Sequence, residues 1–196
     1  RPTGHPVIVH LGPEADPNEW GEMNPLAQTL AEHFWPGPLT LIVKRRPRVL
    51  DEVTGGLDTV GLRVPSHPVA QTLLSAFGGG LAAPSANRFG RISPTTAHHV
   101  QADLGSEVMV LDGGPSAVGI ESTIIDVSEN KPCMLRPGVI DPESIEACVG
   151  PLGISNTPAP GTLKSHYAPM TSLLLSHNPE SDRKRLEAEG RTVAVL

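Results

Sequence analysis

The 196-residue sequence has few cysteines, few aromatic side chains and no long apolar run. Its two cysteines, Cys133 and Cys148, belong to no CxxC or Cys/His pattern. Structural zinc sites and disulfide-rich secreted domains need closely spaced cysteines, so the sequence argues against both. We assign no metal ligand among the side chains. Two isolated thiols fit a reducing compartment, and we expect the protein to be cytoplasmic.

Long apolar runs and an excess of basic residues are also lacking. No run approaches the roughly 18 residues of a membrane span, and no charged-then-apolar export signal leads the chain, so we expect no membrane partner. The formal net charge is −6, which gives no general basic surface for nucleic acids. One local basic cluster, Lys44, Arg45, Arg46 and Arg48, keeps a double-stranded RNA-binding module without catalysis open as an alternative.

Short apolar runs between turn residues predict a mixed α+β domain. Strands are predicted at 6–10, 39–43, 60–64, 80–84 and 108–111, with a hairpin of 122–127 and 131–135. Helices are predicted from Pro25 with Asn24 as its cap, from Ser66, over 94–104 and after Asp141. The order lacks strict strand–helix alternation, so we expect a twisted, partly antiparallel sheet with flanking helices. The helix from Ser66 is expected to pack through an apolar stripe of Val69, Leu73, Leu74 and Phe77.

The composition changes after residue 149. Residues 150–170 are rich in Pro, Gly, Ser, Asn and Thr and predict a linker between the main domain, 1–149, and a second domain. Residues 171–196 have a strand–helix–strand pattern, which predicts the start of a small Rossmann-like α/β domain. The chain opens on Arg1 rather than Met, so we expect that an N-terminal part is missing and that the second domain is truncated.

The segment Pro84-Ser85-Ala86-Asn87 is the strongest local sign of a binding site. It follows an apolar run, and Ser85 and Asn87 lie two residues apart, so they share one face of an extended chain. A hydroxyl and an amide placed in this way can hold one ligand. The alternative is a turn stabilised by local bonds from these side chains to the backbone.

Three arginines lie close to the ends of apolar runs. Arg63, between Leu62 and Val64, either faces water or, in a sheet covered on both faces, pairs with a ligand carboxylate. Arg1 and Arg136 are either surface charges or, as a pair, suited to a polyphosphate. The sequence has no Walker loop, GxGxxG motif, nucleophile elbow or catalytic triad. Any nucleotide is therefore bound in another way.

Single residues near other segment ends add candidates. His10 ends the first predicted strand and is a candidate site residue, with a structural role as the alternative. Tyr167, the only tyrosine, lies in the predicted linker. Its large amphipathic ring is expected to pack against the edge of the core or the mouth of a pocket.

Seven motifs together resemble the YrdC-like family, and within it the long-form threonylcarbamoyl-AMP synthases that carry an extra C-terminal domain. They are Arg1-Pro2 with Pro6 and His10, Pro36-Gly37-Pro38-Leu39-Thr40, Gly61-Leu62-Arg63-Val64-Pro65, Pro84-Ser85-Ala86-Asn87 with Ser93-Pro94-Thr95, Glu121-Ser122-Thr123, Leu135-Arg136-Pro137-Gly138, and His166-Tyr167-Ala168-Pro169. One motif alone is weak, but seven in family order from residue 1 to about 170 are highly specific.

The resemblance implies a YrdC-like twisted mixed sheet and the ATP-dependent formation of threonylcarbamoyl-adenylate from L-threonine and bicarbonate or CO₂, with release of pyrophosphate. This is the first step of a threonylcarbamoyladenosine modification of tRNA, and a threonylcarbamoyl-transfer machinery is the implied partner. Mg²⁺ is implied as the companion of ATP. Carried over by position, the ATP contacts are Arg1, His5, Thr59, Asn87, Ser93, Arg136 and Tyr167, and the threonine contacts are His10, Arg63, Ser85 and Ser122. No catalytic residue is assigned, and Arg1, Arg63 and Arg136 act by positioning.

Two departures from the family pattern limit the expectation. Family members carry a Thr-rich strand and a lysine two residues before the position of Arg1, and neither is present in this sequence. We therefore expect weak or no synthase activity from residues 1–196 alone, whereas ATP binding can persist. A carbamoyl-adenylate-forming maturation enzyme that uses carbamoyl phosphate is a further alternative on the same scaffold.

Overall fold

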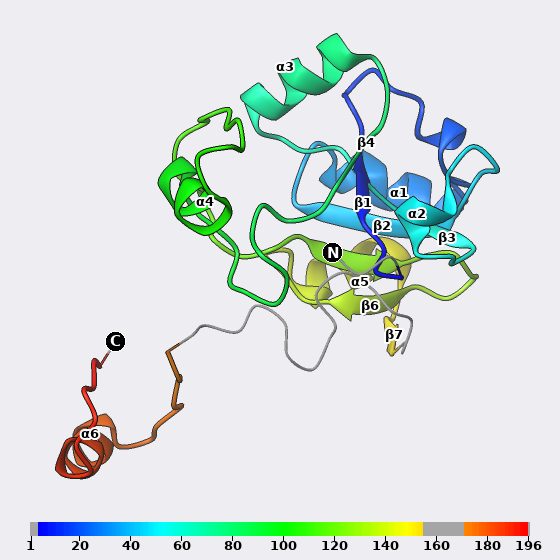
Figure 1. Ribbon diagram of the computed structural model, residues 1–196. Coiled ribbons are helices and arrows are strands. Elements are labelled where there is room, and N and C mark those ends of the chain that lie inside the picture. Colours follow the sequence, from blue (N-terminus) through cyan, green and yellow to red (C-terminus); the bar gives the residue numbers. More distant parts are fainter. Residues whose placement is uncertain (1–3, 155–170, 196) are drawn as a thin grey trace.

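A seven-stranded mixed sheet forms the centre of the computed structural model, which describes residues 4–154 and 171–195 (Figure 1). The strand order is β4-β1-β3-β2-β5-β6-β7. The strands are β1 (Ile8–His10), β2 (Leu39–Lys44), β3 (Thr59–Arg63), β4 (Leu81–Ala83), β5 (Thr123–Asp126), β6 (Cys133–Arg136) and β7 (Gly153–Ile154). Pairs β1–β3, β2–β5 and β6–β7 are parallel, and pairs β1–β4, β2–β3 and β5–β6 are antiparallel. This confirms the predicted mixed sheet.

Helices follow most of the strands. They are η1 (Pro17–Glu19), α1 (Pro25–Phe34), α2 (Asp51–Thr54), α3 (Pro68–Phe77), α4 (Ala97–Leu104), α5 (Pro142–Val149) and α6 (Pro179–Ala188). Figure 1 shows α4 and its flanking loops to the left of the sheet, within the long connection between β4 and β5. Among the described residues, no helix has the length and apolar character needed to cross a bilayer.

One face of the sheet carries the main hydrophobic core. Alternate residues such as Val9, Leu41 and Leu62 are at most 1% exposed and pack in one cluster with Leu30 of α1 and Ile145 of α5. Alternation places every second strand residue on this face, because successive side chains of a strand point to opposite sides. The intervening residues therefore lie together on the second face.

The start of α1 shows how local sequence positions an element. The Asn24 side chain accepts a hydrogen bond from the Ala27 amide (2.9 Å), and Pro25 occupies the first helical position. The same side chain donates to the Val127 carbonyl (2.6 Å), just after β5. A cap of this kind contributes about 1 kcal/mol. Asn24 thus both starts the helix, as predicted, and joins it to the sheet.

Two predictions about the region from 66 to 111 are wrong. Helix α3 begins after His67 rather than Ser66, and of its predicted stripe only Leu74 is buried, whereas Val69 and Phe77 are 39% and 61% exposed. No strand forms at 108–111, where Met109 is 88% exposed. Both segments have the right local pattern, but in the described residues no neighbouring layer or strand covers them.

The part after residue 149 also differs from expectation. The sheet continues past Gly150, since β7 pairs with β6 inside the range predicted as a linker. In the described residues 171–195, the two strands of the predicted strand–helix–strand pattern, Leu173-Leu174-Leu175 and the run that starts at Thr192, do not form, because they have no strand partner there. Leu196 lies outside the described residues.

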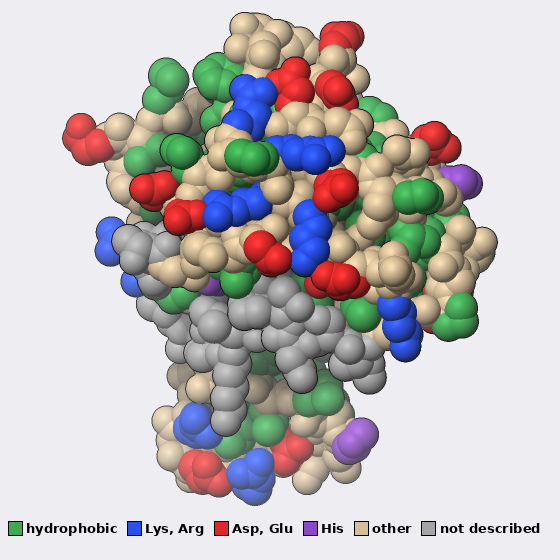
Figure 2. Space-filling model, turned by 90° about the vertical axis from the view of Figure 1, so that its right-hand side faces the viewer, with side chains coloured by type: hydrophobic (Ala, Val, Ile, Leu, Met, Phe, Trp, Pro, Cys, Tyr) green, Lys and Arg blue, Asp and Glu red, His purple; other side chains and the backbone are tan. Residues whose placement is uncertain are grey.

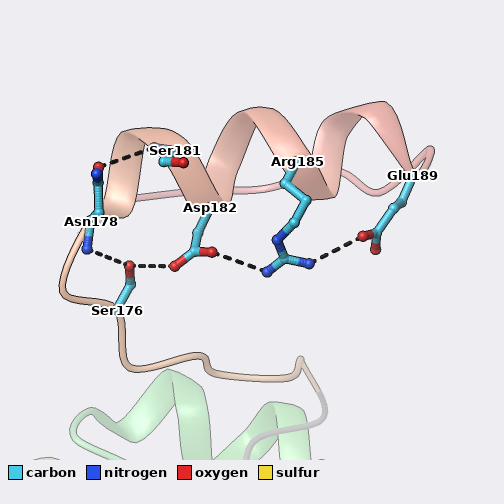
Figure 3. Close-up of polar contacts among 6 residues, drawn as sticks. All are labelled: Ser176, Asn178, Ser181, Asp182, Arg185 and Glu189. Atoms are coloured by element: carbon cyan, nitrogen blue, oxygen red, sulfur yellow. Dashed lines mark hydrogen bonds and ion pairs between the residues drawn. The ribbon is translucent and has the colours of Figure 1, made fainter.

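Helix α6 forms as predicted and is stabilised by its own side chains (Figure 3). Asn178 caps its first turn, and Ser176 donates to the Asp182 carboxylate (2.6 Å). Arg185 then bonds both Asp182 and Glu189, at 3.1 Å each. Pairs spaced three or four residues apart each contribute a few tenths of a kcal/mol, about 0.2–0.5. These local bonds account for a helix that has no buried residue of its own.

Candidate functional site

Polar and cationic side chains gather on the second face of the sheet, at the His10 end of β1. His10 pairs with Arg63, and the register of β2 with β3 places Thr40 opposite Arg63. Thr40 pairs in turn with Ile124, and Ile124 pairs with Arg136. Residues paired directly across a sheet point to the same face. Five strands therefore meet in one region, and β5 lies between β2 and β6 there.

A buried hydrogen-bond network links three of the strands at this end. The hydroxyls of Thr40 and Ser122 are 2.7 Å apart, and Arg136 donates through Nη2 to Ser122 Oγ (3.0 Å). Arg136 Nε also donates to the Ser122 carbonyl (3.0 Å). Thr40, Ser122 and Arg136 are 0%, 4% and 8% exposed. The Ser122 side chain is thus held between a hydroxyl and a guanidinium.

Arg63 lies beside this network and carries a charge that burial disfavours. Its Nε donates to the Gly37 carbonyl (3.0 Å). Burial, and then the nearby Arg136 charge, lower the pKa of Arg63. Within the described part of the chain, no carboxylate forms an ion pair with Arg63. Two adjacent guanidiniums stabilise an anion bound between them, so this arrangement suits a carboxylate or phosphate.

His10 lies next to Arg63 on the edge of the same cluster. Burial, and then the Arg63 charge, lower the pKa of His10 to about 4. The imidazole is therefore neutral at physiological pH, and it can donate one hydrogen bond and accept another. His10 adds polarity to the site without adding a third positive charge.

The His10 pKa predicts a specific dependence of stability on pH. An unfolded histidine binds its proton below about 6.5, whereas folded His10 binds it only below about 4. The unfolded state therefore holds more protons between these values, and the free energy of unfolding falls as the pH falls through this range, by roughly 3 kcal/mol. Urea denaturation at several pH values should show this fall in wild type and a smaller one in His10→Gln.

The control is His98→Gln, which makes the same change at an exposed histidine of α4. It should keep the wild-type pH dependence. An NMR titration that gives His10 an ordinary pKa would contradict the prediction.

Ser85 and Asn87 lie toward the other end of β1. Strand β4 runs antiparallel to β1, with Ala83 opposite Ile8 and Leu81 opposite His10, so the chain leaves β4 at the Ile8 end. Ser85 is partly buried, and Asn87 is 6% exposed and donates to the Arg91 carbonyl (2.6 Å).

Two more predicted nucleotide contacts lie at the Ile8 end. Thr59 begins β3 and precedes Gly61, the partner of Ile8, by two residues. His5 packs edge-on against Phe89, with ring centroids 5.4 Å apart. The structure therefore brings His5, Thr59 and Asn87 to one end of the sheet.

The predicted threonine contacts mostly occupy the opposite end. His10, Arg63 and Ser122 lie there together, whereas Ser85 lies with the predicted nucleotide residues. Arg136, predicted as an ATP contact, lies with Ser122. The two groups are separated by a few residues of strand, on the order of 10 Å at 3.3 Å per residue. This arrangement fits an elongated ligand better than a compact one.

The candidate site also contains residues to which the sequence analysis assigned no role. Thr40 bonds Ser122, and Glu121 accepts a hydrogen bond from the Ser93 hydroxyl (2.6 Å). Thr40 stands as a polar residue inside the apolar run of β2, and this was the available signal. Glu121 lies next to Ser122 in the sequence, but its bond to Ser93, 28 residues away, depends on the fold.

Two predicted contacts, Arg1 and Tyr167, lie outside the described residues. Their roles stay predictions.

Two family models together match nearly the whole chain. The Sua5/YciO/YrdC family model, described as "Telomere recombination", matches residues 1–138. A second model, described as "Threonylcarbamoyl-AMP synthase, C-terminal domain", matches residues 140–196. The first match contains all five strands that meet at the candidate site.

Individual relatives are more than a third identical to this chain over the aligned residues. The threonylcarbamoyl-AMP synthase of Bacillus subtilis is 40% identical over 211 residues, which covers 100% of this chain and 61% of that protein. The synthase of Pyrococcus abyssi is 36% identical over 215 residues, covering 100% of this chain and 63% of that protein. The chain thus spans about three-fifths of the length of these curated relatives.

A solved structure agrees with the sequence matches. The crystal structure of P. abyssi Sua5 complexed with L-threonine is similar with a TM-score of 0.88 and 36% identity. The similarity covers 97% of this chain and 62% of that chain. It therefore includes the sheet that carries Arg63, Ser122 and Arg136.

Proposed function

The chain belongs to the Sua5/YciO/YrdC family, and we propose that it forms threonylcarbamoyl-AMP from L-threonine, bicarbonate or CO₂, and ATP, with release of pyrophosphate. The observation that carries this proposal is the partly buried Arg63 beside the Thr40–Ser122–Arg136 network. A solved relative was crystallised with L-threonine, and this amino acid offers a carboxylate and a hydroxyl to such a group of donors.

In the proposed reaction, the Arg63 guanidinium holds the threonine carboxylate, and the Ser122 hydroxyl orients the polar groups of the amino acid. The neutral amine adds to CO₂ and loses a proton, which gives a carbamate. A carbamate oxygen then attacks the α-phosphorus of ATP, and the bond to pyrophosphate breaks. Arg136 is proposed to stabilise the charge on the phosphate. Positioning of this kind can lower a barrier by about 7–11 kcal/mol without a covalent enzyme intermediate.

Magnesium is proposed as a companion of ATP rather than as a resident metal of the protein. Within residues 4–154 and 171–195, no group of three or more His, Cys, Asp or Glu side chains could hold a metal ion. A guanidinium donates hydrogen bonds to phosphate oxygens and has no lone pair for a metal ion, so the described residues fit a nucleotide that brings its own cation. When bound, Mg²⁺ would neutralise the triphosphate oxygens.

Binding and turnover measurements test the proposal directly. Calorimetry with the 196-residue chain should detect binding of both ATP and L-threonine. In a pyrophosphate-release assay, the ATP consumption of this chain is expected to be weak, and L-threonine should drive it better than carbamoyl phosphate does. Absence of binding of both ATP and L-threonine would contradict the proposal, and a preference for carbamoyl phosphate would favour the maturation-enzyme alternative.

The RNA-binding alternative loses support because three of the four residues in the basic cluster pair with carboxylates, whereas Arg46 donates to the Asn18 carbonyl. Lys44 pairs with Asp58 (3.0 Å) and Glu129 (2.8 Å), and these carboxylates raise the Lys44 pKa. Arg45 pairs with Asp51 (2.6 Å). Arg48 pairs with Glu19 and lies over the Trp20 ring. Figure 2 shows basic and acidic side chains interleaved over one face of the molecule. RNA phosphates would have to displace these carboxylates.

The wider assignments follow from the same proposal. We propose that the catalytic domain extends from residue 1 to the end of β7 at Ile154, that the following residues up to 170 link it to the domain beginning at 171, and that a tRNA-modifying transfer machinery receives the product. Cys133 and Cys148 are both free thiols, which supports a reducing compartment such as the cytoplasm.

A further inference from the structure

Asp103 of α4 holds both sides of the turn that follows Asn87. Its carboxylate accepts from the Arg88 amide (2.6 Å) and from Arg91 Nη1 (2.8 Å). Its carbonyl accepts from Arg88 Nε (2.8 Å). One helical residue therefore ties the first and last residues of the 88–91 turn.

The 88–91 turn holds the side chain of Asn87. The Arg91 carbonyl accepts the hydrogen bond from Asn87 Nδ2 (2.6 Å), and the Arg91 amide donates to the Arg88 carbonyl (3.1 Å). The orientation of the Asn87 carboxamide thus depends on where Arg91 lies. Because Asp103 holds Arg91 and Arg88, a chain of contacts runs from α4 to Asn87.

The environment of Asp103 keeps its carboxylate charged. Its side chain is 17% exposed, compared with 45% for Arg91. The hydrogen bond from the Arg88 amide, and then the Arg91 side chain, hold the pKa of Asp103 below its usual value. Hydrogen bonds that involve an ionised group are stronger than neutral ones. The contacts of Asp103 with Arg88 and Arg91 are therefore stronger than an ion pair between two mobile surface side chains.

We propose that Asp103 is a positioning residue for nucleotide binding, acting through the Arg88–Arg91 turn on Asn87. This role depends on the proposed function, because Asn87 is placed there in the nucleotide site. Asp103 touches neither ligand in this proposal. Its substitution should weaken ATP binding and leave L-threonine binding unaffected, since Arg63 and Ser122 lie on other elements, at the His10 end of the sheet.

The test compares Asp103→Asn with Asp182→Asn, which makes the same chemical change in α6. Calorimetry should show that Asp103→Asn weakens ATP binding by about tenfold, as expected for lost charge-assisted hydrogen bonds, and changes L-threonine affinity less than about twofold. Asp182→Asn should change neither. Arg91→Ala, which keeps the backbone carbonyl, should give a smaller loss of ATP affinity and serves as a second variant if Asp103→Asn folds poorly.

A double-mutant cycle separates positioning from general destabilisation. In an Asn87→Ala background, Asp103→Asn should cause no further loss of ATP affinity, because its route to the ligand is already removed. Hydrogen exchange of the Arg88 amide, which bonds Asp103 directly, should become faster in Asp103→Asn.

Additive effects in the cycle, or unchanged ATP affinity in Asp103→Asn, would overturn the positioning role alone. A wild-type chain that binds no ATP would overturn the proposed function, and this role with it.

Discussion

Replacing Arg63 with alanine is expected to weaken L-threonine binding by about 100-fold and to change ATP affinity less than about threefold. The guanidinium is partly buried at the His10 end of the sheet, and it pairs with no carboxylate of the described residues. A substrate carboxylate is therefore its proposed counter-ion. Calorimetric titration of each ligand separately measures the two affinities.

Two further variants make this prediction specific. Arg63→Lys keeps the charge but loses the planar fork, so we expect an intermediate loss of L-threonine affinity, about tenfold. Arg46→Ala removes an arginine from another part of the surface and should change neither affinity. Equal losses of ATP and threonine affinity in Arg63→Ala would contradict the assignment of Arg63 to the amino acid.

Arg63→Ala should cause little loss of folding stability. Arg63 is close to Arg136, and burial of both charges is unfavourable, so removing one guanidinium relieves repulsion while it loses the bond to the Gly37 carbonyl. We expect the melting temperature of Arg63→Ala to stay close to that of wild type. This expectation separates loss of binding from loss of folding.

Replacing Gly138 with alanine should damage both the fold and the site. A Cβ at this position would lie 2.4 Å from the Thr123 amide nitrogen and 2.7 Å from the Glu121 carbonyl oxygen. Contacts this short with backbone cannot be relieved by turning a side chain, so the chain on either side of Ser122 must move. The Thr123 amide also donates to the Pro38 carbonyl (3.0 Å), which joins β5 to the chain entering β2.

We expect Gly138→Ala to lower the free energy of unfolding by about 3 kcal/mol and to weaken threonine binding, because Ser122 moves with its neighbours. Urea denaturation measures the first effect and calorimetry the second. Gly79→Ala is the matched control, since its added Cβ would meet only the Phe77 ring, at 3.4 Å. Similar stabilities of the two variants would contradict the close approach of backbone at Gly138.

Local signals in the sequence were sufficient to predict most helices and strands. The Asn24-Pro25 start of α1 and the β5–β6 hairpin formed as predicted. Caps, turns and alternation act over a few residues, so they can be recognised without knowledge of the fold. The same signals failed at 108–111 and along α3, because a strand needs a free sheet edge and an apolar stripe needs a facing layer.

The candidate site, too, could be predicted from the sequence only in part. The amino-acid order alone determined that Arg63, Ser122 and Arg136 stand at the ends of apolar runs, together with the chemistry that each could offer. Only the tertiary structure decided that Thr40 bonds Ser122 across 82 residues of sequence and that Asp103 reaches the turn after Asn87. Periodicity and capping are local properties, whereas strand order and register depend on contacts between distant segments, and these contacts decide which side chains meet.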